Sequence, residues 1–273
     1  MNRARRTALV RSVVLLLPLG LLSCRGGPAA GQDPCRVFLC DHDGIVRGDT
    51  SARRMSLVFT GGSFADGGAH IRKVLREEGV KAGFFFTGDF YRTPEFADLI
   101  RGLVSDGHYL GAHSDRHLLY CDWGDRQKTL VTRDAFRADL LANYSELERF
   151  GIGRNEARLF IPPYEWYNRD IAAWCRELGL SLFNFTPGTS SNADYTTPSM
   201  PEYKSSREIY DRILAYEKND PNGLNGFILL VHIGTDPERT DKFYLMLGEL
   251  IRDLKGKGYA LVRIDELLRQ PGK

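Results

Sequence analysis

Strongly one-sided charge is missing from this chain of 273 residues. Its 37 Lys and Arg against 35 Asp and Glu leave a formal charge of +2, and no run of five like charges occurs. Because proteins that bind nucleic acids usually carry a basic patch or stripe, we expect no nucleic-acid partner. At 42% hydrophobic and 26% charged residues, the composition is that of an ordinary globular protein, long enough for one large domain or two small ones.

Cysteine is also scarce, with five residues in the chain, and no two of them form a Cys-x-x-Cys pair. The sequence therefore gives no support for a thiolate zinc site. Cys35 and Cys40 are spaced for a local disulfide in an oxidising compartment, but with Cys121 and Cys175 also present the spacing does not fix the pairing.

The apolar stretch from Ser12 to Leu22 is too short to span a bilayer comfortably, since a spanning helix takes roughly 20 apolar residues. It follows a basic segment and ends in Leu21-Leu22-Ser23-Cys24, an order typical of a secretory signal. That ending resembles a bacterial lipobox, which implies cleavage before Cys24, lipidation of its thiol and a membrane-tethered protein facing the periplasm or the cell exterior. The alternative is plain secretion.

The chain divides into three predicted segments. Residues 1–23 are predicted to be a signal peptide of the lipoprotein type. Residues 24–50 are predicted to be a tether and N-terminal extension, because the stretch after Cys24 is rich in Gly and Pro. Residues 51–273 are predicted to form the catalytic domain.

From Met55 onward, short apolar runs alternate with longer segments of helical period, and the runs resemble strands buried on both faces. The expected strands are Ser56–Thr60, Gly83–Thr87, Tyr109–Ala112, Arg158–Ile161, Ser181–Phe185, Phe227–His232 and Ala260–Ile264. The expected helices, several followed by a glycine suited to a left-handed cap, are Ala69–Glu78, Pro94–Ser105, Arg133–Phe150, Asn168–Leu178, Ser206–Lys218 and Thr240–Lys257. This alternation predicts a parallel sheet with helices outside, built from about seven βα units.

In such folds the active site lies at the carboxyl ends of the strands. His113 and His117 follow one expected strand, and His232 ends another. A His-x-x-x-His pair on one side of a helical turn brings two imidazoles within reach of one metal ion. Because such pairs also occur on solvated surfaces, it is the place after a buried strand that favours a metal site.

The order of these elements resembles the polysaccharide deacetylases of carbohydrate esterase family 4, also called the NodB-homology domain. The resemblance covers roughly residues 55–268. The matching segments are Leu57-Val-Phe, Lys81-Ala-Gly-Phe-Phe-Phe, His113-Ser-Asp-Arg-His117, Pro162-Pro163-Tyr164 and Leu229-Leu-Val-His232. It implies a distorted (β/α)7 barrel of the glycoside hydrolase–deacetylase type.

The resemblance also implies an activity. In that family a divalent metal, usually zinc, is held by one Asp and two His, and its bound water attacks an N- or O-acetyl carbonyl. A second Asp acts as base, an Arg steadies that Asp, and a late His protonates the leaving group. Carried over, His113 and His117 are metal ligands and His232 is the general acid. The implied substrate is an acetylated polysaccharide or oligosaccharide outside the cytoplasm.

Two departures from the family pattern change what this site contains. Thr60 and Gly61 stand where the two aspartates belong, and Ile161 stands where the family has Arg. In either of two alignments Asp66 is the only local carboxylate, so we expect it to be the third metal ligand and to act in catalysis; a turn-forming Asp-Gly is the alternative. Losing the Arg together with its carboxylate costs far less than losing one of them, which indicates a site rebuilt as a unit.

Further polar and aromatic residues are expected at the same rim. Asp115 and Glu165 are carboxylates that a rebuilt site offers as a base. Tyr164, Trp166 and Asp194 are expected to bind substrate. The aromatic candidates for stacking on a sugar ring are Tyr120, Trp123, Tyr164, Trp166 and Tyr167.

These expectations describe a metal-dependent hydrolase that removes acetyl groups from an extracytoplasmic glycan. The missing base and Arg leave two alternatives open. One is a non-catalytic carbohydrate-binding protein on the same fold. The other is a hydrolase of a different bond, such as a non-peptide C–N bond, because fold alone does not decide the reaction.

Overall fold

The structure, a computed structural model, describes residues 34–269 of the chain. The predicted signal peptide and Cys24 lie outside the described residues. Residues 34–269 belong to one compact unit. Within that range, no helix is both long enough and apolar enough to cross a membrane.

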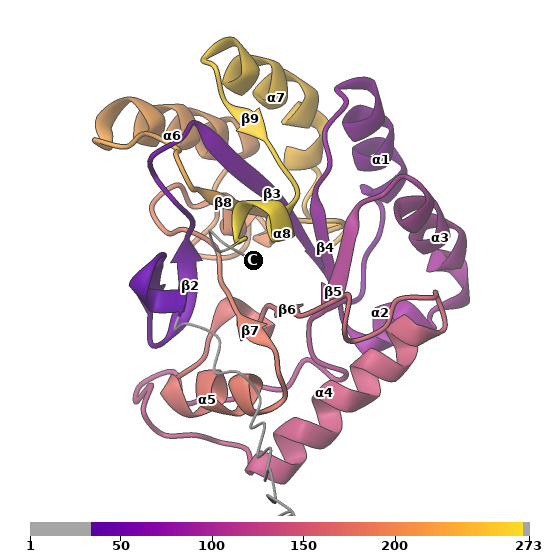
Figure 1. Cartoon of the computed structure of the whole chain (residues 1–273). Coiled ribbons are helices and arrows are strands. Elements are labelled where there is room, and N and C mark those ends of the chain that lie inside the picture. The colour runs from indigo at the N-terminus through magenta and orange to yellow at the C-terminus, as the bar shows by residue number, and fades with distance from the viewer. Residues whose placement is uncertain (1–33, 270–273) are drawn as a thin grey trace, which may run out of the picture. The chain divides into compact units, whose positions relative to one another are not determined.

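Within the described residues, a sheet of seven parallel strands forms the centre of the fold (Figure 1). The strands are β3 Arg54–Gly61, β4 Gly83–Phe86, β5 Tyr109–Ala112, β6 Leu159–Phe160, β7 Ser181–Leu182, β8 Ile228–His232 and β9 Ala260–Leu261. They run in the order β7-β6-β5-β4-β3-β8, and β9 pairs with the start of β3. Because every pairing is parallel, all carboxyl ends lie at the same edge, and the predicted α/β fold is confirmed.

Helices surround the strands, as Figure 1 shows. They are α1 Gly68–Glu77, α2 Gly88–Arg92, α3 Ala97–Ser105, α4 Arg133–Glu148, α5 Arg169–Glu177, α6 Ser206–Asn219, α7 Leu247–Gly256 and α8 Ile264–Leu267. Thr132, Asn168 and Ser205 cap α4, α5 and α6 by accepting a hydrogen bond from the backbone N–H three residues on. The glycines predicted to cap helix ends do have positive φ: Gly79, Gly107, Gly151, Gly179 and Gly258.

Aromatic side chains fill the core on both sides of the sheet. Phe84, Phe85 and Phe86 of β4 are all fully buried, because helices cover one face and the barrel interior covers the other. The rings of Phe59 and Phe84 stack with centroids 4.9 Å apart, and Phe86 stacks on Phe90 of α2 at 4.1 Å. This packing holds the carboxyl ends of β3 and β4 in place, next to the cavity described below.

A hairpin from the predicted N-terminal extension closes the sheet between β7 and β8. Its strands are β1 Leu39–Asp41 and β2 Gly44–Arg47, which pair antiparallel. Beside β7, the Asn184 N–H donates to the Ile45 carbonyl oxygen at 2.7 Å. Beside β8, the Gly48 N–H donates to the Gly226 carbonyl oxygen, also at 2.7 Å. The described part of the extension therefore belongs to the barrel wall.

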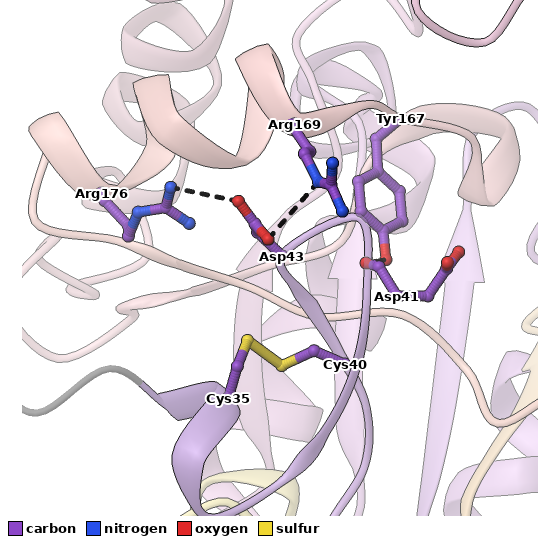
Figure 2. The surroundings of a disulfide bond; sticks show 7 residues. All are labelled: Cys35, Cys40, Asp41, Asp43, Tyr167, Arg169 and Arg176. Carbon is purple, nitrogen blue, oxygen red and sulfur yellow. Dashed lines mark hydrogen bonds and ion pairs between the residues drawn. A yellow bond between two sulfur atoms is a disulfide. The ribbon is translucent and has the colours of Figure 1, made fainter.

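The hairpin is anchored at both ends (Figure 2). A disulfide joins Cys35 to Cys40, a pairing that the sequence left open. At the hairpin turn, Asp43 lies 3.7 Å from Arg169 and 3.6 Å from Arg176 of α5. These half-exposed ion pairs contribute little individually, so the backbone bonds of β2 hold the hairpin in place. The free cysteines of the described residues are both buried: Cys121 and Cys175.

Some elements differ from the predicted ones. The strand expected at 260–264 has only two residues, Ala260–Leu261, and Ile264–Leu267 is the short helix α8. The sequence pattern also fails to predict the hairpin and α2, because each is too short to show a period.

Candidate functional site

A cavity of about 650 Å³ opens at the carboxyl ends of the strands. Residues that follow β3, β4, β5 and β8 form its walls, together with three loops. Of the seven residues expected from the sequence to bind the metal, act in catalysis or bind substrate, four line it: His113, His117, Tyr164 and His232. The other three, Asp66, Trp166 and Asp194, do not line it. The candidate base Glu165 and the candidate stacking residue Trp123 also line it.

His113 directly follows β5 and is fixed by two neighbours. Its backbone N–H donates to Oδ1 of Asn143 at 2.8 Å. Its Nδ1 lies 3.0 Å from the carbonyl oxygen of Ile161; since a carbonyl only accepts, Nδ1 carries the proton. The lone pair of Nε2 is therefore free. A backbone carbonyl on the far nitrogen is the usual support of an imidazole that binds a metal.

The two histidines do not share a helical turn, contrary to the prediction. They lie on an irregular loop in which Ser114 (φ 70°) and His117 (φ 55°) adopt the left-handed conformation. The rings of His113 and His117 are nevertheless neighbours, with centroids 5.0 Å apart. The Tyr164 ring packs edge-on against His117 at 4.3 Å. The loop brings the imidazoles together by a route that helical spacing does not describe.

One buried carboxylate, Asp139 of α4, holds this loop. It accepts hydrogen bonds from the Ser114 hydroxyl at 2.7 Å and the Tyr120 hydroxyl at 3.1 Å. It also accepts from the backbone N–H groups of Asp115 (3.1 Å) and Arg116 (3.0 Å). Asp139 therefore positions the backbone between the two histidines, although it does not line the cavity.

Burial keeps both imidazoles neutral. It lowers the pKa of His113 well below its usual 6.5 and the pKa of His117 to about 4. Within residues 34–269, neither ring nitrogen of His117 has a hydrogen-bond partner. Neutral imidazoles with free lone pairs are the form that binds a metal, so the pair fits two ligands of a divalent ion.

Asp66 does not join the pair. Its carboxylate accepts from the Tyr244 hydroxyl at 2.9 Å and from the Thr235 N–H at 2.8 Å, and it lies 3.0 Å from the Lys242 ammonium. Partial burial would raise the pKa of Asp66, but the bonds from Lys242 and the others lower it. In the part of the chain that the structure describes, no group of three or more His, Cys, Asp or Glu is arranged to hold a metal ion. Asp66 instead ties the loop after β3 to the segment after β8.

Glu165 is the carboxylate that faces the histidines. Its Oε1 lies 4.0 Å from Nε2 of His113, and its side chain is 11% exposed. Burial raises the pKa of this carboxyl to about 7. No group of the described residues donates a hydrogen bond to it. The other candidate base, Asp115, is bound by Arg92 at 2.6 Å and does not line the cavity.

His232 and Asp194 form a hydrogen-bonded dyad. Oδ1 of Asp194 lies 2.6 Å from Nδ1 of His232, and Oδ2 accepts from the His232 backbone N–H at 2.9 Å. Burial alone would lower the pKa of His232, but the adjacent Asp194 carboxylate outweighs it and raises the pKa. Asp194 is almost fully buried and both its oxygens are engaged, so it positions His232. The expected role in substrate binding does not suit this geometry.

Uncharged residues stand where the family has two Asp and one Arg: Thr60, Gly61 and Ile161. Thr60 and Gly61 form an uncharged wall of the cavity. Thr60 lines the cavity, and its hydroxyl is buried without a partner among the described residues. A Cβ at Gly61 would lie 2.6 Å from Ile233 and 3.0 Å from Phe86, so the fold leaves no room for an aspartate there. Ile161 is fully buried. The rebuilding inferred from the sequence therefore extends to the packing behind the site.

Aromatic side chains form one side of the rim. Trp123 and Tyr164 line the cavity and are 58% and 46% exposed. Trp166 stacks on Trp123 with centroids 5.5 Å apart, and it supports the rim without lining the cavity. Tyr120 and Tyr167 are fully buried, so of the expected aromatics these two serve packing.

A parallel α/β barrel with histidines and a buried carboxylate at the carboxyl ends of its strands belongs to the class of barrel proteins whose sites lie at that edge. Comparison with family models narrows the class: the model of polysaccharide deacetylases matches residues 47–183. The chain belongs to the polysaccharide deacetylase family.

Two relatives and one solved structure illustrate the similarity. A peptidoglycan-N-acetylglucosamine deacetylase of Bacillus cereus is 24% identical over 197 residues, covering 72% of this chain and 79% of that protein. A peptidoglycan-N-acetylmuramic acid deacetylase of Bacillus subtilis is 22% identical over 242 residues, covering 88% and 81%. The crystal structure of a CE4 family pseudoenzyme from Bacillus anthracis matches with a TM-score of 0.65 at 19% identity, covering 84% of this chain and 70% of that one. The predicted barrel of the NodB type is confirmed.

Proposed function

We propose that this chain is a metal-dependent hydrolase that removes N- or O-linked acetyl groups from a polysaccharide outside the cytoplasm. The observation that carries the proposal is the meeting of three groups at one cavity: the histidine pair, Glu165 and the His232–Asp194 dyad. Acetyl hydrolysis needs an activated water, an acceptor for its proton and a donor for the leaving group. Each of the three groups suits one of these tasks.

His113 and His117 would hold the metal, which we expect to be zinc. When bound, the ion would lower the pKa of a water molecule and polarise the acetyl carbonyl. Catalytic zinc sites usually have three protein ligands, whereas His113 and His117 supply only two. We therefore expect this protein to release its metal more readily than a site with three ligands.

Glu165 and His232 would move the protons. The Glu165 carboxylate, beside His113, would take a proton from the attacking water. Protonated His232, held by Asp194, would give a proton to the departing sugar nitrogen or oxygen as the bond to the acetyl carbon breaks. The water oxygen then remains on the acetate. The proposal thus keeps the family's reaction and replaces its base.

The N-terminal segment and the relatives support the proposed place of action. The sequence of residues 1–23 is typical of a signal peptide, and Cys24 follows as the proposed site of a lipid anchor. Both relatives described above are named for deacetylation of peptidoglycan. An acetylated glycan facing the periplasm or the cell exterior is therefore the proposed substrate.

A second candidate function is glycan binding without turnover. It is favoured by the uncharged wall at Thr60 and Gly61 and by the lack of a three-residue metal group among the described residues. A CE4 pseudoenzyme is also among the structures that match the fold.

Acetate release from acetylated chitooligosaccharides and acetylated xylan, measured beside metal content, separates the two functions. We expect His113→Ala to lose the metal and His232→Ala to keep it, while both lose activity by at least about 100-fold. The control is His42→Ala, at a histidine in the hairpin turn that does not line the cavity. Full activity in metal-free protein would contradict the proposed reaction. Glycan binding that survives His232→Ala, with no acetate from any substrate, would establish the second function.

A further inference from the structure

Trp123 presents an open indole at the rim of the cavity. The residue is 58% exposed, and it lines the cavity beside Tyr164 and His117. Large apolar side chains kept open to water next to a cavity are typical of surfaces that a ligand covers. Trp123 and Tyr164 are in contact and both exposed, so they form an aromatic patch beside the cavity, which a single exposed residue would not.

The Trp123 ring is held in place by its neighbours. It stacks on Trp166 with 25° between the planes, and the Trp123 and Tyr164 rings meet edge-to-face with centroids 5.7 Å apart. Trp166 is fixed in turn, because its Nε1–H donates to the carbonyl oxygen of Asp122 at 3.1 Å. The Arg126 guanidinium lies 4.3 Å from the centre of the Trp166 ring. A ring fixed in this way loses little conformational freedom when a ligand binds.

Apart from Asp125, whose carboxylate accepts from the Gln127 N–H at 3.1 Å, the charges beside the rings are paired with each other. Arg126 lies 2.9 Å from Asp41, and Lys128 lies 3.4 Å from Asp122. These pairs leave no dominant charge next to Trp123, so its open face suits a neutral ligand with a flat apolar side. The C–H face of a pyranose ring has this character.

We propose that Trp123 is a stacking platform for a second sugar ring of the glycan, next to the acetylated sugar in the cavity. The inference rests on the proposed function, because it requires the cavity to take a sugar of the same chain. Trp123 contacts the ligand, and Trp166 is a positioning residue beneath it. The platform makes the site select oligosaccharides over single sugars.

Calorimetric binding of N-acetylglucosamine and of its tetramer tests the platform in wild type, Trp123→Ala and Trp123→Phe. Covering one indole face removes on the order of 60 Å² of apolar surface from water, which corresponds to about a tenfold change in affinity. Trp123→Ala should therefore weaken tetramer binding about tenfold and change monosaccharide binding by less than about twofold, while Trp123→Phe keeps most of the affinity. Leu245→Ala, at an apolar residue that is 60% exposed outside the cavity, should leave both affinities unchanged. Thermal melting confirms that each variant is folded.

Equal weakening of both ligands, or tetramer binding that Trp123→Ala leaves intact, overturns the platform. Acetate release in the same samples tests the proposed function separately. Wild-type protein that binds the tetramer through Trp123 but releases no acetate contradicts the hydrolase and supports the platform. Acetate release whose preference for the tetramer survives Trp123→Ala contradicts the platform alone.

Discussion

Glu165 and the residue before it hold an unfavourable backbone conformation. Tyr164 and Glu165 have φ of 58° and 52°, and left-handed conformations cost non-glycine residues roughly 1–2 kcal/mol each. The turn is held by the Glu165 N–H, which donates to the Pro162 carbonyl oxygen at 3.0 Å, and by Asn184 Nδ2, which donates to the Glu165 carbonyl oxygen at 2.7 Å. Such strain is usually kept where it serves function, and here it directs a carboxylate toward His113.

The first prediction concerns Glu165→Gln, which keeps the shape of the side chain and removes the base. We expect kcat to fall by about 100-fold or more, since general base catalysis usually contributes 10²–10⁴-fold. The metal content and the melting temperature should not change, because the histidine pair remains. Steady-state kinetics with metal analysis measure this. Glu238→Gln, at an exposed residue outside the cavity, is the matched control, and an unchanged kcat in Glu165→Gln would rule Glu165 out as the base.

The second prediction compares one new aspartate at two adjacent positions. Gly61→Asp should lower the free energy of unfolding by about 1–3 kcal/mol, because its Cβ would press into Ile233 and Phe86. Thr60→Asp should instead raise metal affinity, since side chains alternate along β3 and Thr60 lines the cavity. Chemical denaturation and metal titration distinguish them. A Gly61→Asp variant as stable as wild type would show that the packing behind the site is loose.

The sequence predicts a site residue correctly when its role follows from nearby residues, and fails when the role depends on a partner far along the chain. His113 is predictable because it follows a buried strand, and His232 because it ends one; both positions can be recognised from the local sequence pattern. Asp66 and Asp194 are misassigned from sequence, since their roles are decided by distant side chains such as Lys242 and His232. The sequence names Glu165 only as one of several candidate bases. The direction of its side chain depends on a left-handed turn at Tyr164 and Glu165, which the residues Pro-Pro-Tyr-Glu do not predict.

The helix α4 positions the site although none of its residues lines the cavity. The helix α4 follows the histidine loop in sequence and packs beside it, with Asp139 and Asn143 four residues apart on one face. Asp139 fixes the middle of the loop and Asn143 fixes His113. The helical spacing of apolar residues predicts α4 correctly. In that pattern Asp139 and Asn143 appear only as polar residues that interrupt the apolar face. Asn143 bonds to backbone groups, and Asp139 bonds to both backbone N–H groups and the hydroxyls of Ser114 and Tyr120. The sequence pattern of α4 reveals none of these partners, because they lie on other segments.

At this scale the third prediction is that Asp139→Asn destabilises the protein and loosens the histidine pair. An amide in place of the carboxylate turns one acceptor into a donor facing the Arg116 N–H, so we expect a loss of about 2 kcal/mol in the free energy of unfolding. Metal affinity should fall while kcat at saturating metal stays close to that of wild type. Denaturation and metal titration measure the two effects. Asp134→Asn, an exposed change on the same helix, controls for loss of charge; equal effects would remove Asp139's special role.

Three buried histidines of the described residues have a pKa below the usual value because burial disfavours their charged form: His108 and the pair in the site. His108 is 6% exposed, and its Nδ1 accepts from the Ala82 N–H at 3.2 Å. Its Nε2 is buried with no partner among the described residues. Burial lowers the pKa of His108 to about 4. Protons therefore bind His108 more readily when the chain is unfolded.

The fourth prediction follows from that difference. Because the folded pKa of about 4 lies below the usual 6.5, the stability due to neutral His108 is fully present above about pH 6.5 and is lost as the pH falls toward 4. His108→Asn, which keeps an acceptor for Ala82, should remove about 2–3 kcal/mol of this dependence between pH 7 and pH 4. Urea denaturation of both proteins across that range measures the difference. Parallel stability curves would show that His108 already takes up a proton in the folded state.

The strand β2 closes the barrel with partners that are far away along the chain. The Thr186 hydroxyl donates to the Val46 carbonyl oxygen across 140 residues, and Arg47 donates to the Gly223 carbonyl oxygen across 176. Contacts of such long range form late in folding, because the intervening chain must first be ordered. We therefore expect β2, which is synthesised before β3 to β9, to join the sheet late in folding. Until it does, β7 and β8 expose unpaired edges, and this seam is where a folding chain is most open to pairing with another copy.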